Sequence, residues 1–288
     1  MENNNNNMKI ETTYYENGSI ATETSYMNEK MHGTYKTFFE TGILSTEEEY
    51  VNGVKQGTHK EYTEDGTLFI ETPYVNGKRN GIQKQYYGDD IEGKLILQSE
   101  IPYVNDEICG TVKTYYLTEY STENRLSTEE PFLNGNRNGV SKYYSEMGTI
   151  AAEINYVNDV IHGAYIKYYE NGNKKKETTF VYNIINGIEI TYYENGNKKK
   201  ETPFVNGIVN GVERTFNEAG LLKKETPFKN DIIEGLVVIY FEDGKGNKKK
   251  ETPYENGIVN GVERTFNENG AIKKEIIYKN GVKQQKEN

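Results

Sequence analysis

The sequence predicts an all-β protein, built as an elongated array of about eleven tandem β-hairpin repeats that form a single twisted antiparallel meander. Three observations support this prediction. A unit of mostly 24 residues recurs along the chain, each unit has turn signals at two fixed places, and the segments between them are short and rich in β-formers. Residues 204–227 read FVNGIVNGVERTFNEAGLLKKETP, and residues 254–277 read YENGIVNGVERTFNENGAIKKEII. Self-similarity of this kind indicates a repeat architecture, in which each unit contacts only its neighbours.

Four positions define the unit. An opening aromatic residue begins each copy, at Tyr26, Tyr50, Tyr74, Tyr103, Phe132, Tyr156, Phe180, Phe204, Phe228, Tyr254 and Tyr278. A repeat glycine follows seven residues later, at Gly33, Gly57, Gly81, Gly110, Gly139, Gly163, Gly187, Gly211, Gly235 and Gly261. A second aromatic residue stands five positions after that glycine, from Phe38 to Phe266, and a repeat glutamate stands three positions before every opening aromatic, from Glu23 to Glu275.

In chain order, three segments are expected. Residues 1–10 contain five consecutive asparagines and are predicted to be a disordered tail. Residues 11–282 form the repeat array, in which the units over residues 74–131 are longer than the rest. Residues 283–288 form a polar C-terminal tail, which could block the pairing of an exposed end strand with another copy.

Each unit reads as two strands and two turns. The segment after the repeat glycine is β-prone, as in GVERTF and GLVVIYF, and it meets a turn such as ENG or EAG. Asn-Gly between strand formers is a strong hairpin signal, because both residues accept positive φ. A second strand such as LLKKETPF follows, and a region such as VNGIVNG leads to the next unit. With strands about 4.8 Å apart, such an array forms a rod on the order of 100 Å long.

The strand register depends on the ENG turn, and two alternatives remain open. A turn with a bulge at its glycine places both aromatic sets on one face of the sheet. A two-residue Asn-Gly turn places the second aromatic and the repeat glutamate on one face instead. It also creates the cross-strand pairs Lys36–Glu47, Lys60–Glu71, Arg214–Glu225 and Arg264–Glu275.

Helix is a poor alternative for these segments. Glycines recur every seven to nine residues, and no segment keeps a 3.6-residue period over three turns. The six prolines all stand directly before an opening aromatic. Because proline cannot donate to a ladder, this position is typical of a strand end or an edge.

The bulk composition narrows the class of protein. Residues 1–155 contain 25 acidic and 13 basic side chains, whereas residues 156–288 contain 19 and 21, so the N-terminal half is acidic. An acidic surface attracts basic partners and repels nucleic acid and anionic membranes, although it also serves simply as a solubilising surface. No apolar run is long enough for a membrane helix or a signal peptide, and Cys109 is the only cysteine. We therefore expect a cytoplasmic protein without disulfides.

The spacing of these residues resembles the bacterial variant of the MORN repeat. The pattern Y-x-N-G-x-x-x-G-x-x-x-x-Y-Y-x-N-G covers about residues 11 to 284, and residues 254–270 match it well. The resemblance implies a β-hairpin array with a role in binding, and similar proteins are commonly labelled as antitoxin components of toxin–antitoxin systems. It supplies no catalytic residues.

The two longer units depart from this pattern. Both carry their extra residues between the two strands, in the segments YYGDDIEGKLIL and YYLTEYSTENRLS. Adjacent hairpins with long tips place two loops side by side, and loops on a rigid scaffold often carry recognition. The candidate partner-binding residues are Asp89, Asp90, Glu92, Glu119, Tyr120 and Glu123. Neutral drift in length, which surface tips tolerate, is the alternative.

Other chemical groups are better explained by structure. A glutamate that recurs eleven times suits a cross-strand ion pair or a backbone acceptor rather than catalysis. Each lysine run, at Lys174–Lys176, Lys198–Lys200 and Lys248–Lys250, is followed by a glutamate, which favours a solvated sheet surface over a basic stripe for nucleic acid or lipid.

The remaining reactive groups form no recognisable site. The histidines lack cysteine or carboxylate partners at ligand spacing, and His32 and His162 read as turn residues beside the repeat glycine. The chain contains no nucleophile, metalloprotease, phosphate or dinucleotide motif, and no base stands at a fixed position near Cys109. We expect no catalytic, metal or cofactor site and no small-molecule ligand.

Two classes of function follow. The first is a non-enzymatic protein that binds and neutralises a protein partner, as an antitoxin, immunity protein or inhibitor does. Its partner is expected to have a basic surface, such as that of a nucleic-acid-handling protein. The second class is a structural or membrane-associated scaffold for protein assembly, which lacks support from an amphipathic helix or a basic surface. Direct binding to nucleic acid or a membrane is not expected.

Overall fold

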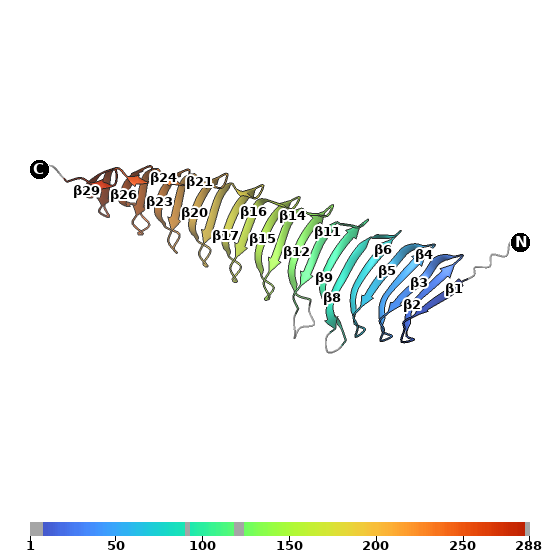
Figure 1. Ribbon diagram of the computed structural model, residues 1–288. Helices are drawn as coiled ribbons and strands as arrows, with labels where there is room; N and C mark the ends of the chain where they lie inside the picture. Colours follow the sequence, from blue (N-terminus) through green and yellow to red (C-terminus); the bar gives the residue numbers. More distant parts are fainter. Residues whose placement is uncertain (1–7, 90–92, 118–123, 286–288) are drawn as a thin grey trace. The chain divides into compact units, whose positions relative to one another are not determined.

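A computed structural model of the chain describes residues 8–89, 93–117 and 124–285 (Figure 1). It divides into two compact units, unit 1 over Met1–Gly148 and unit 2 over Thr149–Asn288. The described residues of each unit form strands and turns, without a helix. The prediction of an all-β array of tandem hairpins in an antiparallel meander is therefore confirmed.

In unit 1, strands that are neighbours in sequence pair antiparallel. The strands are β1 (Met8–Tyr14), β2 (Ile20–Met27), β3 (Lys30–Phe38), β4 (Leu44–Val51), β5 (Val54–Tyr62), β6 (Leu68–Val75), β7 (Lys78–Arg79), β8 (Gly81–Asp89), β9 (Leu95–Val104), β10 (Glu107–Ile108), β11 (Gly110–Tyr115), β12 (Leu126–Leu133), β13 (Asn136–Arg137) and β14 (Gly139–Tyr144). β1 therefore includes the last three residues of the expected N-terminal tail.

Unit 2 continues the same pattern of pairing. Its strands are β15 (Ile150–Val157), β16 (Val160–Tyr168), β17 (Lys174–Val181), β18 (Ile184–Ile185), β19 (Gly187–Tyr192), β20 (Lys198–Val205), β21 (Ile208–Val209), β22 (Gly211–Phe216), β23 (Leu222–Lys229), β24 (Ile232–Ile233), β25 (Gly235–Tyr240), β26 (Lys248–Glu255), β27 (Ile258–Val259), β28 (Gly261–Phe266), β29 (Ile272–Lys279) and β30 (Val282–Lys283).

The turn after the opening aromatic is the two-residue Asn-Gly hairpin. Val205 pairs with Ile208 across it, and the two central residues, Asn206 and Gly207, have φ of 51° and 81°. Positive φ at both positions is the signature of a type I′ turn, whose twist matches that of the flanking strands. Several copies replace the glycine by another residue that keeps a positive φ, namely Glu29, Asp106, Asp159, Asn183 and Asp231.

The ENG turn has a different geometry. In the copy after β22, the amide of Gly220 donates to the carbonyl of Asn217 over 2.9 Å, and Gly220 has a φ of 82°. This is a type I turn followed by a glycine bulge. A further register shift occurs one step along the strand, where Phe216 pairs with Leu222 and Thr215 pairs with Lys224. The two irregularities together determine the register.

The observed register combines parts of both sequence alternatives. The loop is the bulged ENG turn, so a two-residue Asn-Gly turn at this place is wrong. The strand bulge nevertheless places the second aromatic and the repeat glutamate on one face of the sheet, as the second alternative predicts. We call this face the glutamate face. The expected cross-strand partners Lys36–Glu47, Lys60–Glu71, Arg214–Glu225 and Arg264–Glu275 are opposite each other.

The repeat glycine marks a break in the strand that follows the Asn-Gly turn. Gly211 has a φ of 122°, and a Cβ there would lie 3.0 Å from Cγ of Pro203 on the preceding strand. The amide of Asn210 donates to the carbonyl of Pro203 at the same place. The prediction that the prolines occupy strand ends or edges is therefore wrong for Pro203, which lies inside β20 opposite the break and pairs with Ile188.

The core of each sheet is thin and partly polar. On the face opposite the repeat glutamates, which we call the threonine face, the threonine two residues before the opening aromatic is buried in six units. These residues are Thr24, Thr72, Thr178, Thr202, Thr226 and Thr252. Among the described residues few apolar side chains are buried, and four of those seven are tyrosines. A hydroxyl on a ring suits such a sheet, because it can bond at the edge of the packed layer.

Candidate functional site

The predicted partner-binding residues lie mostly outside the described residues. Asp90, Glu92, Glu119, Tyr120 and Glu123 fall within residues 90–92 and 118–123, which the structure does not describe. Asp89 ends β8, is exposed, and pairs with Leu95 at the base of the first long hairpin. The ladder of this hairpin continues beyond Tyr86 through Gly88. Part of the added length in this unit is therefore extra strand.

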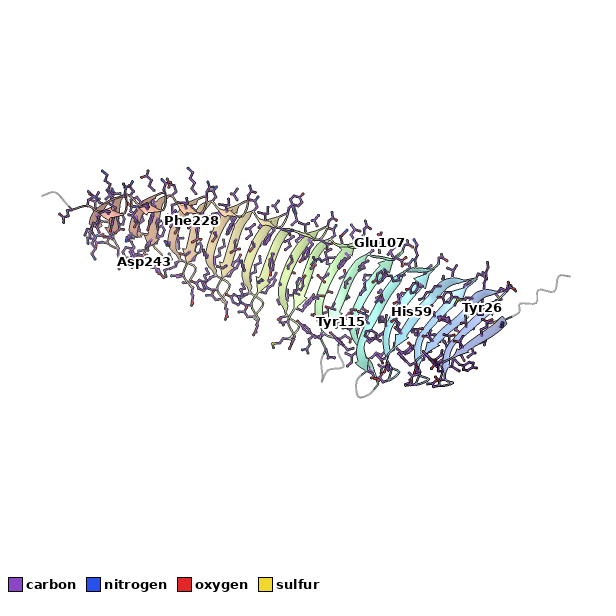
Figure 2. The ribbon with its side chains drawn as sticks, in the orientation of Figure 1. Tyr26, His59, Glu107, Tyr115, Phe228 and Asp243 are labelled. Atoms are coloured by element: carbon purple, nitrogen blue, oxygen red, sulfur yellow. The ribbon has the colours of Figure 1, made fainter. Side chains whose placement is uncertain are left out.

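The bases of the two long hairpins pack together. Tyr86, Leu97 and Tyr115 form a buried apolar cluster there, with Leu68, Leu95 and Leu126 packed against it. Figure 2 labels Tyr115 of this cluster. The hydroxyl of Tyr87 in the first hairpin donates to the carbonyl of Tyr115 in the second over 3.1 Å. The amide of Leu97 donates to Oδ1 of Asn124 over 3.3 Å. These contacts hold the two adjacent bases in one packed layer.

The repeat glutamate accepts a hydrogen bond from the second aromatic of the following copy. Tyr192 donates to Oε2 of Glu177 over 3.1 Å, and Tyr240 donates to Oε2 of Glu225 over 2.7 Å. The same bond occurs in four further pairs, Tyr86–Glu71, Tyr115–Glu100, Tyr144–Glu129 and Tyr168–Glu153. The glutamate therefore joins one copy to the next, which agrees with the structural role expected for it.

The tyrosine–glutamate bond changes the ionisation of both partners. Burial and the hydrogen bond to Glu177 raise the pKa of Tyr192 to about 12. The hydrogen bond from Lys174, together with that from Tyr192, lowers the pKa of the Glu177 carboxyl despite its partial burial. The proton therefore stays on the phenol and the charge on the carboxylate. Such an arrangement suits a hydrogen-bonded link and offers no group prepared for acid–base catalysis near neutral pH.

The lysine runs of unit 2 are paired with glutamates. The first lysine of each run lies 2.6–3.1 Å from the repeat glutamate of its own strand, in the pairs Lys174–Glu177, Lys198–Glu201 and Lys248–Glu251. The third lysine reaches a glutamate of the next copy on the threonine face, in the pairs Lys176–Glu189, Lys200–Glu213 and Lys250–Glu263. The middle lysines lie over aromatic rings. This agrees with a sheet surface of balanced charge and gives no support to a basic stripe.

His59 has carboxylate partners that spacing alone did not reveal. Its Nε2 lies 3.0 Å from Glu61, two residues along β5, and its Nδ1 lies 3.2 Å from Glu48 on β4, outside hydrogen-bond geometry. Only the strand register brings Glu48 to this position. The interpretation of His32 and His162 as turn residues is also wrong, because both lie inside strands, in β3 and β16, beside the register shift at the repeat glycine. Among the described residues, no group of three histidine, cysteine or carboxylate side chains is arranged to hold a metal.

A surface that sequence reasoning missed lies along the ENG turns of unit 1. Its exposed carboxylates are Glu16, Glu40, Glu64, Asp65 and Asp89, and we call them the acidic turn edge. The strands that follow the first three turns begin with Ile20, Leu44 and Leu68. The turns of unit 2 also carry glutamates, such as Glu170, Glu194 and Glu218, but three of the strands that follow them begin with the lysine runs. A comparison of the residues after each turn in the sequence would have revealed this difference.

The first two turns of this edge are bonded to one another. Nδ2 of Asn17 in the first turn donates to the carbonyl of Glu40 in the next over 3.1 Å, and Oγ of Ser19 donates to the same carbonyl. The hydroxyl of Tyr15 donates to the carbonyl of Phe38 over 2.6 Å. Glu16 and Glu40 therefore project from two turns that are fixed to each other.

Comparison with known proteins identifies the family of the repeat but no similar curated protein. None of the curated proteins compared with the chain matches it. Among solved structures, one described as the crystal structure of TcdB2-TccC3-TEV aligns at 13% identity over 96% of this chain and 15% of its own, with a TM-score of 0.22. The Photorhabdus luminescens Tc holotoxin pore with the TccC3-D651A mutation aligns at 13% identity over 93% and 14%, with a TM-score of 0.20. This chain thus spans about one seventh of each, and no inference follows from such low TM-scores.

The described residues contain no helix of the length and apolarity that a bilayer span requires.

The MORN repeat variant matches seven segments, residues 9–28, 31–52, 55–76, 137–158, 161–182, 185–206 and 259–280, which together make up more than half of the chain. The segments begin and end within the hairpins described above, and the two long hairpins fall between matches. The chain therefore belongs to the MORN repeat variant family and is a repeat scaffold protein.

Proposed function

We propose that this scaffold is a non-enzymatic binding protein that occupies and neutralises a protein partner with a basic surface, in the manner of an antitoxin, immunity protein or inhibitor. The acidic turn edge of unit 1, with its exposed carboxylates, is the main support for this proposal. The turns of unit 2 also carry glutamates, but lysine runs follow three of them, so the net negative charge of this edge is concentrated in unit 1.

The spacing of these carboxylates suits the attraction of a basic protein. Successive ENG turns are two strands apart, which corresponds to roughly 10 Å at the usual strand separation. Because this distance is close to the Debye length at physiological ionic strength, which is about 8 Å, neighbouring turns contribute to one negative field. Such a field accelerates association with a positive surface and disfavours partners of like charge.

The rigidity of the edge also favours binding. The bonds between the first two turns, Asn17 to Glu40 and Tyr15 to Phe38, hold this part of the backbone before any partner arrives. A preorganised surface loses less conformational entropy on association than a flexible one. The bases of the two long hairpins also pack together. We retain Asp90, Glu92, Glu119, Tyr120 and Glu123, which lie outside the described residues, as further candidate contacts.

Neutralisation of the acidic turn edge tests the proposal. A variant with Glu16→Gln, Glu40→Gln, Glu64→Gln and Asp65→Asn keeps the shape and the turn acceptors but removes four charges. We expect its capture of a basic protein from lysate at low salt to weaken by at least about tenfold, since each exposed charge contributes a fraction of a kcal/mol. The matched control is Glu170→Gln, Glu194→Gln and Glu218→Gln in the turns of unit 2, which should capture as the wild type does.

The outcomes separate the two classes of function. Equal capture by all three proteins, without salt dependence, would contradict the proposal. Co-sedimentation with anionic vesicles, without any captured protein, would support a membrane-associated scaffold instead. Replacement of Asp89, Asp90, Glu92, Glu119 and Glu123 by serine separately tests the long loops: we expect weaker capture from a folded protein, and unchanged affinity would remove these residues from the site.

A further inference from the structure

A further aromatic position recurs at the tips of the hairpins. It directly follows the second aromatic, and where it holds an aromatic residue we call that residue a turn ring. The turn rings are Tyr15, Phe39, Tyr87 and Tyr116 in unit 1, and Tyr169, Tyr193 and Phe241 in unit 2. The other copies have Thr63, Ser145, Asn217 and Asn267 at this position. Both units therefore carry such rings.

In unit 2 a lysine lies over each turn ring. It is the residue of the strand bulge, five positions before the opening aromatic, and it has no partner opposite it in the ladder. Its Nζ lies 5.3–5.8 Å from the ring centroid in the pairs Lys175–Tyr169, Lys199–Tyr193 and Lys249–Phe241. A cation within about 6 Å of a ring centroid is attracted by the negative face of the ring. The repeat itself thus shows which ligand a turn ring accepts, namely a cationic side chain.

Unit 1 has the turn rings without these lysines. The same bulge position holds Ala21, Ser45, Gln98 and Ser127. In the described part of unit 1, Lys55 and Arg79 lie over Tyr74 and Tyr103, and no lysine or arginine lies over a turn ring. Residues 1–7, 90–92 and 118–123, which the structure does not describe, contain no lysine or arginine. Unit 1 therefore supplies no basic side chain of its own to these rings.

The turn rings of unit 1 are held in the same way as those of unit 2. The hydroxyl of Tyr193 donates to the carbonyl of Phe216 over 2.9 Å, and that of Tyr87 donates to the carbonyl of Tyr115 over 3.1 Å. The same bond occurs in the pairs Tyr15–Phe38 and Tyr116–Tyr144. Each hydroxyl reaches the same backbone position of the next copy, which orients the ring before a ligand arrives. Tyr87 is 42% exposed, so a ligand can reach its ring.

Three of the open rings have a carboxylate of the acidic turn edge close by in sequence. The pairs are Tyr15 with Glu16, Phe39 with Glu40, and Tyr87 with Asp89 two residues on. These carboxylates are exposed. A cation that docks on the ring is therefore also attracted by a negative charge, and the two attractions act together.

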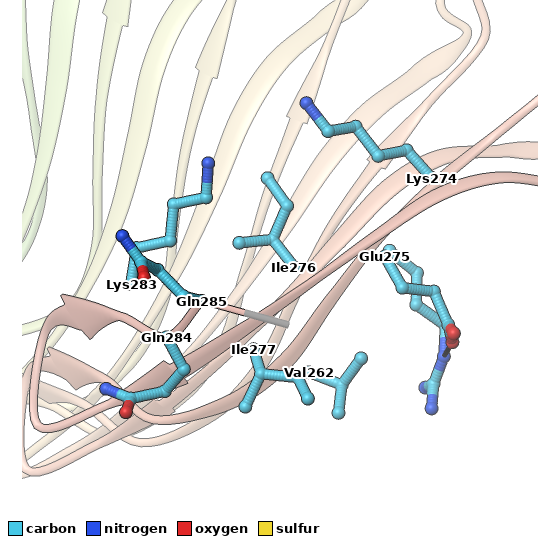
Figure 3. A pocket seen from close by; sticks show the side chains of 9 residues that line it. Val262, Lys274, Glu275, Ile276, Ile277, Lys283, Gln284 and Gln285 are labelled. Carbon is cyan, nitrogen blue, oxygen red and sulfur yellow. Dashed lines mark hydrogen bonds and ion pairs between the residues drawn. The ribbon is translucent and has the colours of Figure 1, made fainter. Parts of the chain in front are cut away.

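Unit 2 suits a cationic partner less. Lysines already lie over its turn rings, and a depression of about 860 Å³ beside β29 is lined by three basic side chains, Arg264, Lys274 and Lys283, and one carboxylate, Glu275 (Figure 3). Like charges disfavour the approach of a basic surface. Of the two units, unit 1 is therefore the one that suits cationic side chains.

We propose that the turn rings of unit 1 bind lysine and arginine side chains of a basic protein partner, in the place that the array's own lysines occupy in unit 2. This inference rests on the proposed function and states how the partner is recognised. Tyr15 and Phe39 belong to adjacent copies, as do Tyr87 and Tyr116, so the rings of each pair are roughly 10 Å apart at the usual strand separation. The partner presents cationic side chains at this spacing. Arginine fits best, because its planar guanidinium stacks on a ring.

Calorimetric titration of the 288-residue chain with deca-arginine at physiological ionic strength tests the proposal. The double variant Phe39→Leu, Tyr87→Leu removes two rings and leaves every charge in place. We expect its dissociation constant for deca-arginine to be about tenfold higher than that of the wild type, because two cation–π contacts are lost. The matched control is Tyr182→Leu, which removes a 69% exposed ring from a turn of unit 2 and should bind as the wild type does. Circular dichroism shows whether each variant is folded.

A second pair of variants tests the same contact while leaving unit 1 intact. Lys175→Ala, Lys199→Ala uncovers two turn rings of unit 2. Its control, Lys223→Ala, Lys273→Ala, removes the same charge from the same repeat position in two copies that have Asn217 and Asn267 in place of a ring. We expect the uncovered variant to bind deca-arginine about threefold more tightly than this control, because only it gains free rings.

The outcomes separate this inference from the proposed function. A wild type that does not bind deca-arginine, equal affinity of the wild type and the double leucine variant, or equal effects of the two pairs of lysine substitutions would overturn the inference. If the carboxylate variant of the acidic turn edge binds deca-arginine more weakly and the leucine variant does not, charge alone attracts the partner, and only the ring sites are refuted. If the rings bind deca-arginine but no basic protein is captured from lysate, the proposed function fails and the cation sites remain.

Discussion

At the scale of the residue, the link between copies is a phenol bonded to a carboxylate. The second aromatic donates to the repeat glutamate of the preceding copy, and the bond recurs from Tyr86 and Glu71 to Tyr240 and Glu225. Most side chains in these sheets are only half buried. Hydrogen bonds to a charged acceptor therefore contribute a larger share of stability here than in a protein with a thick apolar core.

Tyr192→Phe tests the contribution of one such bond. The change removes the hydroxyl and keeps the ring, so Glu177 loses one of its two donors, Tyr192 and Lys174. We expect the free energy of unfolding to fall by about 1–2 kcal/mol, as for a hydrogen bond to a charged group. Urea denaturation measures it. Tyr182→Phe, at a ring that is 69% exposed, is the control and should change stability little. An equal loss in both variants would contradict the assignment.

The same bond predicts a loss of stability at alkaline pH. Burial first, and then the bond to a repeat glutamate, raise the pKa of Tyr168, Tyr192 and Tyr240 to about 12, whereas a free tyrosine titrates near pH 10. The unfolded chain therefore releases these protons first. The stabilisation is complete below pH 10 and falls as the pH rises towards 12. Urea denaturation at pH 9 and pH 11 checks this, and a free energy of unfolding that stays constant or rises would refute it.

At the scale of the element, two turns with similar sequences have different geometries. VNG forms a type I′ turn, and ENG forms a type I turn with a glycine bulge. The repeat glycine serves a third purpose, since it lets the strand break beside the preceding proline. The three glycines of one copy, Gly207, Gly211 and Gly220, are therefore not equivalent.

Gly211→Ala and Gly220→Asn test this difference. Alanine at Gly211 meets the ring of Pro203 at 3.0 Å and has a φ of 122°, which side chains avoid. We expect the substitution to cost about 2–3 kcal/mol, measured by urea denaturation. Asparagine at Gly220 has a φ of 82°, and its Cβ would meet Asn197 only at ordinary contact distances of 3.7–3.8 Å, so it should cost less than about 1 kcal/mol. A larger loss at Gly220 than at Gly211 would contradict these roles.

Much of the element scale could be predicted from the sequence. The repeat and its fixed positions predict the strands, the turns and the absence of long helices. They do not determine the register, because VNG and ENG share the Asn-Gly pair, and this pair alone does not show which type of turn each segment forms. The strand bulge at Lys223 has no sequence signal of its own, yet it decides which side chains share a face. For the same reason the position of His59 beside Glu48 required the structure.

The candidate site was predictable only in part. The long hairpins are visible as extra residues, and Asp89 does stand exposed at the base of one of them. The acidic turn edge has no signal at the positions that all copies of the repeat share. Its signal lies in the variable positions after each turn, where Ile20 and Leu44 replace lysines.

At the scale of the whole molecule, each copy bonds to the copies beside it through the same positions. Stability in such an array is close to a sum of copy and interface contributions. Removal of one whole copy should then leave a folded protein, provided that the strands on both sides of the deletion can pair as neighbouring strands do in the intact array.

Deletion of residues 204–227 tests this. Pro203 then precedes Phe228 directly, Glu201 faces Val238 in place of Arg214, and Tyr240 reaches Glu201 in place of Glu225. We expect a β-rich circular dichroism spectrum and a urea m-value about one twelfth smaller, in proportion to the chain removed. Deletion of residues 204–215 alone removes half a copy, so the strands that it brings together are not ones that pair in the intact array. A half-copy deletion that folds as well as the whole-copy deletion would contradict the model of matching strands.

The near-identity of residues 204–227 and 254–277 has a consequence for how the chain folds. During folding, the partner strand of one copy meets almost the same set of bonds two copies away, so a strand can pair out of order and still satisfy its glutamate and tyrosine. Such a mispaired intermediate has to dissociate before the native order forms. Refolding should therefore show a slow phase that speeds up in mild urea, and the phase should shrink once substitutions make the two stretches different.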